Sequence, residues 1–256
     1  MVEIMADAVR WRIIPLTTNN AAMNMAIDEA ISEAVAAGSS TPTIRFYQWS
    51  PSAVSIGYFQ SLHQEVDVPI AASKGIGIVR RRTGGGAVYH DTNGEITYSV
   101  IAPESLFPKD IIQSYHVICG WIIRGLNQLG IEGSFHPIND ILVGGRKISG
   151  NAQTRRSGVL LQHGTILYDL DLDTMFSVLK VGQEKVSDKL IKDVRQRVTR
   201  LLDHGTFTKE DLYHALVAGF TNGKQWGEGT ITFQERSRAE QLVHEKYSTK
   251  EWNERR

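Results

Sequence analysis

Apolar residues near the start of the chain repeat at helical spacing between positions 21 and 38. They are Met23, Ala26, Ile27, Ala30, Ile31 and Ala34. Asn19 and Asn20 precede this stretch and can cap a helix, and Gly38 follows it. We therefore predict a helix here, with one apolar side packed against the rest of the protein.

Short runs of β-branched and aromatic residues follow, at positions 43–49, 53–59, 76–81, 87–90 and 95–102. Their composition predicts strands. Between the last two runs lies Asp91-Thr92-Asn93-Gly94, in which the Asn-Gly pair suits a tight reversal. We expect residues 87–102 to form a hairpin.

The apolar pattern returns to helical spacing in the middle of the chain. Residues 111–129 place Ile111, Tyr115, Ile118, Ile122, Leu126 and Leu129 on one stripe. Asp110 can cap this helix and Gly130 can end it. Runs at 140–143, 146–149 and 158–168 then predict strands, with Gly144-Gly145 as a second hairpin turn.

The last third of the chain reads as mainly helical. We predict helices over 172–180 and 209–220, the second capped by Thr208, with a charged segment between them that runs to Arg200. The charged tail from 235 to 256 predicts a surface helix that runs into solvent. Together the elements favour an α+β fold of mixed sheets flanked by helices, with no internal repeat.

Charge and cysteine content narrow the function. The 256 residues hold 28 Lys and Arg against 28 Asp and Glu, so no global charge attracts a nucleic acid. One cysteine cannot form an intramolecular disulfide, which favours a reducing, cytoplasmic location. Residues 1–10 do not read as a secretory signal, and no apolar run is long enough for a membrane span.

A run of three glycines behind three arginines is the most informative segment. Residues 80–91 read RRRTGGGAVYHD and join two predicted strands. Glycines let backbone N–H groups approach an anion, and arginines can pair with its oxygens. A plain glycine turn with solvated arginines is the alternative, because glycine loops alone are weak signals. No P-loop, dinucleotide, zinc-protease, serine-hydrolase or Cys-x-x-Cys motif occurs.

Two further segments carry polar residues in predicted strands. Lys147 lies in NDILVGGRKISGNA and can offer a point cation, with Asp140 as a candidate Mg²⁺ ligand. A solvated lysine and a turn aspartate are the alternatives. His163 in QHGTILYDLDL reads more simply as a satisfied core histidine. Cys119 lies on the apolar stripe of the middle helix, which favours packing over catalysis.

In this order, the three segments resemble the lipoate-protein ligase A family, and in particular its bipartite archaeal-type members. The stretches MNMAIDEAI, IRFYQWSPSAVSIGYFQ and KYSTKEWN add to the resemblance, which covers nearly the whole chain. It implies a single catalytic domain over 1–256, shared with biotin protein ligases and related to class II aminoacyl-tRNA synthetases.

The resemblance also implies an activity. The enzyme would use ATP and Mg²⁺ to convert lipoate to lipoyl-AMP, and would then acylate a lysine of a lipoyl domain or of glycine-cleavage H protein. Many members continue into an accessory domain near the position of residues 245–256, so a separately encoded accessory subunit is expected for the activation step.

Site roles follow from the same resemblance. Lys147 would be catalytic and would hold the acyl carbonyl and the α-phosphate. Binding of ATP and lipoyl-AMP would involve Arg81, Gly84, Gly85, Gly86, Ala87, Val88, Tyr89, His90, Lys147 and Gly150. The lipoyl pocket and its surroundings would include Arg82, Asn139, Asp140, His163 and Gly164, with Asp140 also the candidate metal ligand.

Two other functions remain open beside the ligase. Octanoyltransferases share sequence of the GRKISGNAQTR style but use a cysteine upstream of the lysine strand, where this chain reads Ser134-Phe135-His136-Pro137-Ile138. A transferase acting from a carrier-bound acyl group would need another nucleophile, so we expect the ligase. The remaining alternative is a non-catalytic protein that binds lipoyl-adenylate, and the presence of Lys147 argues against it. A biotin ligase is disfavoured because that family has a different glycine-arginine loop.

Overall fold

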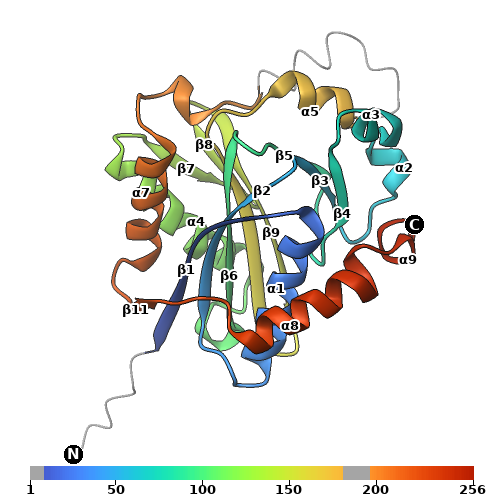
Figure 1. Ribbon diagram of the computed structural model, residues 1–256. Helices are drawn as coiled ribbons and strands as arrows, with labels where there is room; N and C mark the ends of the chain where they lie inside the picture. Colours follow the sequence, from blue (N-terminus) through green and yellow to red (C-terminus); the bar gives the residue numbers. More distant parts are fainter. Residues whose placement is uncertain (1–8, 181–196) are drawn as a thin grey trace, which may run out of the picture.

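Two β-sheets of unequal size form the centre of the structure, a computed structural model that describes residues 9–180 and 197–256 (Figure 1). In its described part, the large sheet has the strand order β11-β1-β2-β6-β10-β9-β8-β7. The strands are β1 (Arg10–Asn19), β2 (Thr43–Trp49), β6 (Glu95–Pro103), β7 (Gly133–His136), β8 (Asp140–Val143), β9 (Arg146–Arg156), β10 (Val159–Leu167) and β11 (Gln225–Glu228). The pairs β11–β1 and β1–β2 are parallel and the other pairs are antiparallel.

Helices cover both faces of the large sheet because its strands alternate apolar side chains between the faces. In β2, Ile44 and Phe46 join the core beneath α4 (Ile111–Gln128) and α7 (Lys209–Thr221). Tyr47 and Trp49 face the other way, toward α1 (Ala21–Ala36) and α8 (Phe233–Leu242). Figure 1 shows these two helix pairs on opposite sides of the sheet. The predicted fold of mixed sheets flanked by helices is confirmed.

The small sheet lies beside the large one. Its central strand β3 (Ala53–Ile56) pairs in parallel with β4 (Gly77–Arg80) and antiparallel with β5 (Val88–His90). A third apolar cluster joins this sheet to the short helices α2 (Leu62–Glu65), α3 (Val68–Ser73) and α5 (Leu172–Val178). The site described below lies between the two sheets.

The predicted helix starts and the glycine hairpin are confirmed. Asn20 accepts a hydrogen bond from the Met23 N–H at 2.9 Å, and Asp110 accepts one from the Gln113 N–H at 2.7 Å. Gly144 and Gly145 connect β8 to β9 with φ angles of 56° and 74°, which glycine adopts easily. Two sequence predictions fall on residues that the structure does not describe. They are the absence of a secretory signal, for residues 1–8, and the charged segment, for residues 181–196.

The predicted hairpin over 87–102 is wrong. Strand β5 belongs to the small sheet and β6 to the large one, where β6 pairs with β2 and β10. The Asp91–Gly94 turn instead carries the chain from one sheet to the other. A turn signal reports only local geometry, whereas the partners of β6 come from distant parts of the sequence.

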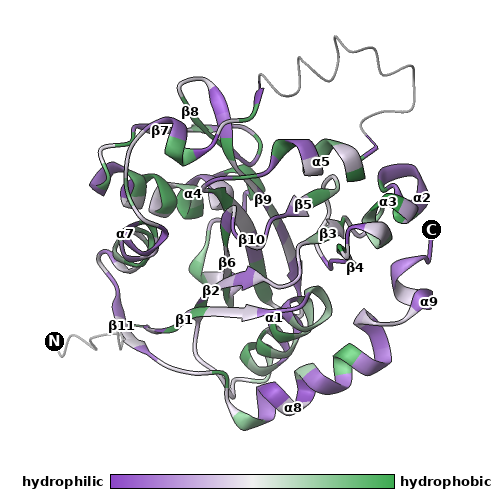
Figure 2. Cartoon of the chain, turned by 45° about the horizontal axis from the view of Figure 1, so that its top comes forward, coloured by the Kyte–Doolittle hydropathy of each residue, from purple (hydrophilic) through white to green (hydrophobic). Residues whose placement is uncertain are grey.

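The expectation that the charged tail runs into solvent is also wrong. After α8 the chain makes a π-helical turn, η3 (Val243–Tyr247), and the short helix α9 (Lys250–Asn253). Figure 2 shows α8 as largely hydrophilic, yet Ala239 and Leu242 are buried against α1. Lys246 contacts Glu29 at 2.7 Å, so the segment packs back onto the core.

Three strands, β1, β7 and β11, have no counterpart among the predicted elements, and two 3₁₀ turns complete the description, η1 (Glu104–Leu106) and η2 (Leu201–Asp203). Across the ranges that the structure describes, every helix is too short or too polar to cross a bilayer.

Candidate functional site

A cavity of about 160 Å³ opens between the two sheets. The large sheet contributes residues of β2, β6, β9 and β10 to its wall, and the small sheet contributes residues of β3 and β5 with the glycine loop. Its apolar lining consists of Met25, Tyr47, Trp49, Ala87, Val88 and Ala152. An elongated aliphatic group would find mainly apolar contacts here, with polar groups at a few points.

Most of the residues that we expected at the site line this cavity. They are Arg81, Gly85, Gly86, Ala87, Val88, His90, Asn139, Lys147, Gly150, His163 and Gly164. The remaining four do not: Gly84 begins the glycine loop and its carbonyl faces Arg81, and Tyr89 faces the core of the small sheet. Arg82 Nε lies 3.6 Å from Glu29 Oε1, and Asp140 pairs with Lys147. Their individual roles stay predictions.

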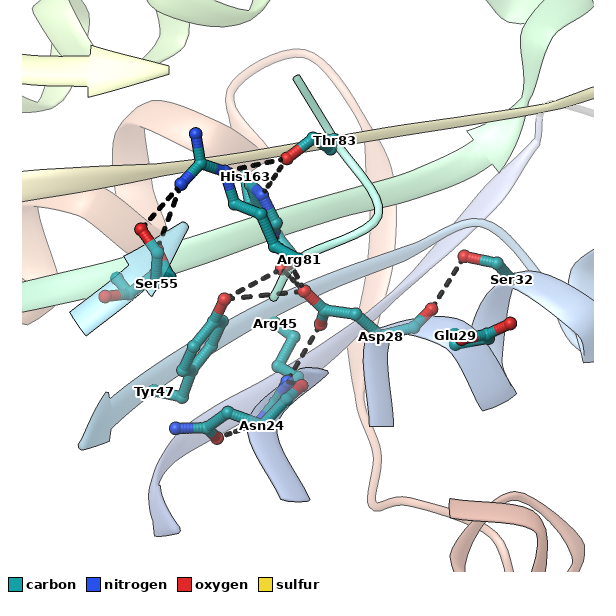
Figure 3. A network of polar contacts seen from close by, with 12 residues as sticks. Asn24, Asp28, Glu29, Ser32, Arg45, Tyr47, Ser55, Arg81, Thr83 and His163 are labelled. Carbon is teal, nitrogen blue, oxygen red and sulfur yellow. Dashed lines mark hydrogen bonds and ion pairs between the residues drawn. The ribbon is translucent and has the colours of Figure 1, made fainter. Parts of the chain in front are cut away.

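Arg81 holds the glycine loop in place through all five of its N–H groups. Its Nε donates to Thr83 Oγ1 at 3.1 Å, and its Nη2 donates to the carbonyls of Gly84 and Gly86 at 2.7 Å each. Its Nη1 donates to the carbonyl and the Oγ of Ser55 at 2.9 and 3.2 Å (Figure 3). Burial lowers the pKa of Arg81 to about 10.

A close backbone contact fixes the same loop on its other side. A Cβ on Gly57 would stand 2.0 Å from the Gly85 carbonyl oxygen, so only glycine fits beneath the loop. Gly85 itself has a φ of 92°, a conformation that other residues rarely adopt. The loop geometry therefore depends on close backbone contacts. In the sequence these contacts are visible only as glycines.

Lys147, which lines the cavity, forms an ion pair with Asp140. Lys147 Nζ lies 2.7 Å from Asp140 Oδ1, and the side chains are 39% and 27% exposed. The lysine lies across Gly150, where a Cβ would stand 2.9 Å from Lys147 Nζ. Three expected site residues thus meet at one place, and the absent side chain of Gly150 sets the position of the cation.

His163 belongs to a buried network centred on Asp28 of α1. Its Nε2 lies 2.7 Å from Thr83 Oγ1 and its Nδ1 lies 3.3 Å from Asp28 Oδ2 (Figure 3). Burial lowers the pKa of His163. Burial alone would raise the pKa of Asp28, but the His163 contact and the Arg45 charge at 2.8 Å bring it below its usual value.

Sequence reasoning missed Asp28. The available signal was a carboxylate at helical spacing among the apolar residues of the first predicted helix, which requires a buried partner. Arg45, in the first predicted strand, is that partner.

A second buried network surrounds His90. Its Nδ1 lies 2.7 Å from Glu95 Oε1, its Nε2 lies 2.8 Å from Ser55 Oγ, and its ring stacks on Trp49 with 3.9 Å between centroids. We expected His90 at the site but not Glu95 or Ser55. Glu95 at the start of a strand that is otherwise buried was the signal that could have pointed to them.

The missing side chain of Gly164 leaves room for the Asn151 side chain beside the cavity. A Cβ at Gly164 would stand 2.0 Å from Asn151 Oδ1, which accepts a hydrogen bond from Tyr98 at 2.6 Å. Asn151 also donates to the Asn139 carbonyl at 2.8 Å. Asn139 and Gly164 therefore both contact Asn151, a cavity-lining residue that was not among the expected site residues.

The expected Mg²⁺ and ATP stay predictions. Asp140 could offer an oxygen ligand, but one of its oxygens already contacts the Lys147 ammonium. Within residues 9–180 and 197–256, His, Cys, Asp and Glu form no group of three with metal-binding geometry. The Arg81 donors contact protein groups rather than pointing freely into the cavity.

Comparison with known proteins identifies the group to which these features belong. Residues 20–221 match the model of the lipoyl protein ligase A/B catalytic domain. The chain is 38% identical to the octanoyltransferases LipM of Kyrpidia tusciae and Geobacillus kaustophilus, covering 96% of this chain and 99% and 98% of theirs. It is 36% identical, with a TM-score of 0.87, to a chain from a Thermoplasma acidophilum structure of a bipartite lipoate protein ligase and its E2 lipoyl domain, covering 96% of both chains.

These relatives correct one expectation and confirm another. The prediction of an ATP-dependent ligase is wrong, because the curated relatives that match over nearly their full length are named octanoyltransferases. The missing upstream cysteine had favoured the ligase, and the transferase kept open as the alternative fits these relatives better. The resemblance to the ligase family itself is confirmed: the chain belongs to the lipoyl protein ligase A/B catalytic domain family.

Proposed function

We propose that the chain is an acyltransferase that moves an octanoyl group from a carrier-bound thioester to a lysine of a lipoyl domain. The names of the full-length relatives support the octanoyl group and the transfer reaction. The Thermoplasma structure, which combines a ligase of this fold with a lipoyl domain, supports the acceptor. Glycine-cleavage H protein and an accessory subunit stay predictions.

The observation that carries the proposal is the combination of an apolar cavity with the partly exposed ammonium of Lys147 at its wall. Trp49, Val88 and Met25 offer walls suited to an aliphatic chain. Arg81, which we expected to clamp a triphosphate, uses its five donors on Ser55, Thr83 and two loop carbonyls. Transfer from a thioester, unlike activation by ATP, has no phosphate to bind and does not require free arginine donors.

Lys147 supplies the charge that the reaction needs. Attack on a thioester carbonyl places negative charge on its oxygen, and a positioned cation stabilises that charge. The Asp140 contact and the bare Gly150 backbone hold the ammonium at the cavity. Because the Lys147 side chain is 39% exposed, an acceptor lysine can approach the same carbonyl from solvent.

The test is the intact mass of a lipoyl domain after incubation with this chain and an octanoyl-carrier thioester, with no ATP present. We expect the domain to gain one octanoyl group. If the domain stays unmodified, and becomes acylated only when free octanoate or lipoate is supplied with Mg·ATP, the transferase proposal is overturned.

A lysine variant tests the site assignment in the same assay. Lys147→Ala should lower the transfer rate by about 10²–10³-fold, the usual loss when one stabilising donor is removed. Its melting temperature should stay close to that of the parent, because the side chain is partly exposed. Lys74→Ala, at an exposed lysine after α3, is the matched control and should transfer at the parent rate. Equal rates for the two variants would contradict the role of Lys147.

A further inference from the structure

The second network forms a continuous chain from carboxylate to imidazole to hydroxyl. Glu95 Oε1 lies 2.7 Å from His90 Nδ1, and His90 Nε2 lies 2.8 Å from Ser55 Oγ. Strand register creates the arrangement: Ala53 pairs with His90 and Ser55 with Val88, so Ser55 and His90 are diagonal neighbours on one face of the small sheet. All three residues are buried.

The surrounding hydrogen bonds set the direction of each proton. Trp49 Nε1 donates to Thr97 Oγ1 at 2.8 Å, and Thr97 in turn donates to Glu95 Oε1 at 2.7 Å. A carboxylate only accepts, so His90 must donate to it from Nδ1. The other ring nitrogen then carries a lone pair, and the Ser55 hydroxyl donates to it. His90 is thereby poised to take the Ser55 proton.

The Arg81 guanidinium stands on the other side of the serine. Its Nη1 donates to Ser55 Oγ at 3.2 Å, so a cation lies next to the oxygen that would become negative on losing its proton. Ser55 and His90 also line the cavity that we assign to the acyl chain. A hydroxyl, a base, an orienting carboxylate and a charge-stabilising cation therefore meet at the cavity wall.

His163 also lies between a hydroxyl and a carboxylate. Thr83 Oγ1 contacts His163 at 2.7 Å, and His163 contacts Asp28 at 3.3 Å. Thr83 is fully buried, however, and is absent from the described residues that line the cavity. The carboxylate contact is also longer than that of His90. Of these two hydroxyls, only that of Ser55 borders the space for substrate.

The only cysteine of the chain is poorly placed to act as the nucleophile. Cys119 lies on the buried side of α4, is 0% exposed in the apolar core, and does not line the cavity. Burial raises the pKa of its thiol to about 12, which keeps it protonated. If this chain transfers acyl groups through a covalent intermediate, another side chain must carry the acyl group.

We propose that Ser55 is the nucleophile of the transfer, with His90 as its general base and Glu95 as the residue that positions His90. The inference rests on the proposed octanoyl transfer. In the first half-reaction, Ser55 Oγ forms an ester bond to the acyl carbon while the carbon–sulfur bond of the thioester breaks. The Ser55 proton passes to His90 Nε2 and then to the departing sulfur, which leaves as the carrier thiol.

The second half-reaction returns the enzyme to its starting state. The neutral amine of the acceptor lysine attacks the Ser55 ester and forms the amide bond. Its proton passes to His90 Nε2 and then to Ser55 Oγ as the ester bond breaks. No oxidant or further reactant is required, and Lys147 can stabilise the carbonyl oxygen in both half-reactions.

The experiment traps the intermediate by leaving out the acceptor. The full chain is mixed with octanoyl-carrier thioester, quenched in acid, and analysed by intact mass and peptide mapping. We expect a gain of one octanoyl group, located on the peptide that contains Ser55. Cys119→Ala should give the same adduct and the same transfer rate, because Cys119 only packs in the core.

Two serine variants distinguish catalysis from folding. Ser55→Ala should form no adduct and lose at least 10²-fold in transfer rate. Ser55→Cys keeps a nucleophile at the position, and its adduct should be released by neutral hydroxylamine, as a thioester is. The parent adduct, an oxygen ester, should survive neutral hydroxylamine and require alkaline conditions.

Other outcomes would contradict either the serine assignment or the transferase function. An adduct mapped elsewhere, or undiminished transfer by Ser55→Ala, overturns the serine assignment. So does complete transfer to the acceptor when the parent enzyme accumulates no adduct without it. If neither the enzyme nor the acceptor gains an octanoyl group from the thioester, the proposed transferase function itself fails.

Discussion

At the scale of single residues, buried polar groups that meet in pairs determine the site. Arg81 and His90 both contact Ser55, and His163 contacts Asp28, so each has a partner from an element distant in the sequence. A motif search could find Arg81 and His90 because they lie in the RRRTGGGAVYHD segment. It could not find Ser55, Glu95 or Asp28, since only the packing of strands and helices brings Ser55 to the cavity and the two carboxylates to the histidines.

Acidification should destabilise the protein through His163. Its folded-state pKa lies below the ordinary value because of burial, whereas the unfolded imidazole gains its proton near pH 6.5. The unfolded state therefore binds more protons as the pH falls, and the free energy of unfolding drops below about pH 6.5. Asp28, whose pKa is also lowered, adds a further loss below about pH 4.

Urea unfolding at pH 8 and pH 5.5 measures this effect. The parent protein should lose stability between the two pH values, and His163→Gln should lose less. His244→Gln, at an exposed histidine of η3, should behave like the parent. Identical pH dependence in the parent and in His163→Gln would show that another group is responsible.

At the scale of elements, a close helix contact distinguishes two glycines of α4. A Cβ on Gly125 would stand 2.7 Å from the Ala215 carbonyl of α7, whereas a Cβ on Gly120 would meet nothing within 4 Å. Gly125→Ala should lower the free energy of unfolding by about 1–3 kcal/mol through overpacking. Gly120→Ala should raise it by up to about 1 kcal/mol, because alanine favours the helix.

Thermal and urea unfolding of the two variants provides the measurement. Since both changes add the same methyl group to the same helix, propensity contributes equally to each. Equal stabilities for the two variants would contradict the close packing of α4 against α7.

The long helices were predictable from the sequence, whereas the short helices α2 and α3 and the strand partners were not. Residues 111–129 show an apolar stripe, an aspartate cap and a final glycine, and α4 has these limits within one residue. Each of those signals acts over one or two turns. The sheet assignment of β5 and β6 depends instead on contacts with β3, β2 and β10, which no local pattern encodes. The failed hairpin over 87–102 follows from that difference.

At the scale of the whole molecule, the C-terminal segment supports the strand that leads into the glycine loop. Arg80, the last residue of β4, donates its backbone N–H to Asn253 Oδ1 at 2.7 Å and its Nη2 to the Asn253 carbonyl at 2.8 Å. Its Nε donates to the Trp252 carbonyl at 3.0 Å. Arg81 is the next residue, so the contacts of Arg80 with α9 also hold the backbone from which Arg81 reaches the cavity.

Asn253→Ala tests this support. The change removes the acceptor of the buried Arg80 N–H and should lower the free energy of unfolding by about 1–3 kcal/mol. Glu254→Ala, at the adjacent exposed position, should leave stability within about 0.5 kcal/mol of the parent. Urea denaturation of both variants measures the two free energies of unfolding. An equal loss of stability in both would contradict a specific role of Asn253 and would indicate a general effect of changing the tail.

The pairing of β1 with β11 has a consequence for synthesis in the cell. Arg10 pairs with Gln225 and Ile13 with Glu228, so the outer edge of β1 is covered only by a strand made about 200 residues later. At about 5–20 residues per second, the ribosome needs roughly 10–40 s to produce that strand. During this interval a nascent chain carries an open sheet edge that other strands can join. Translation speed and chaperone access during this interval should therefore affect the yield of this protein.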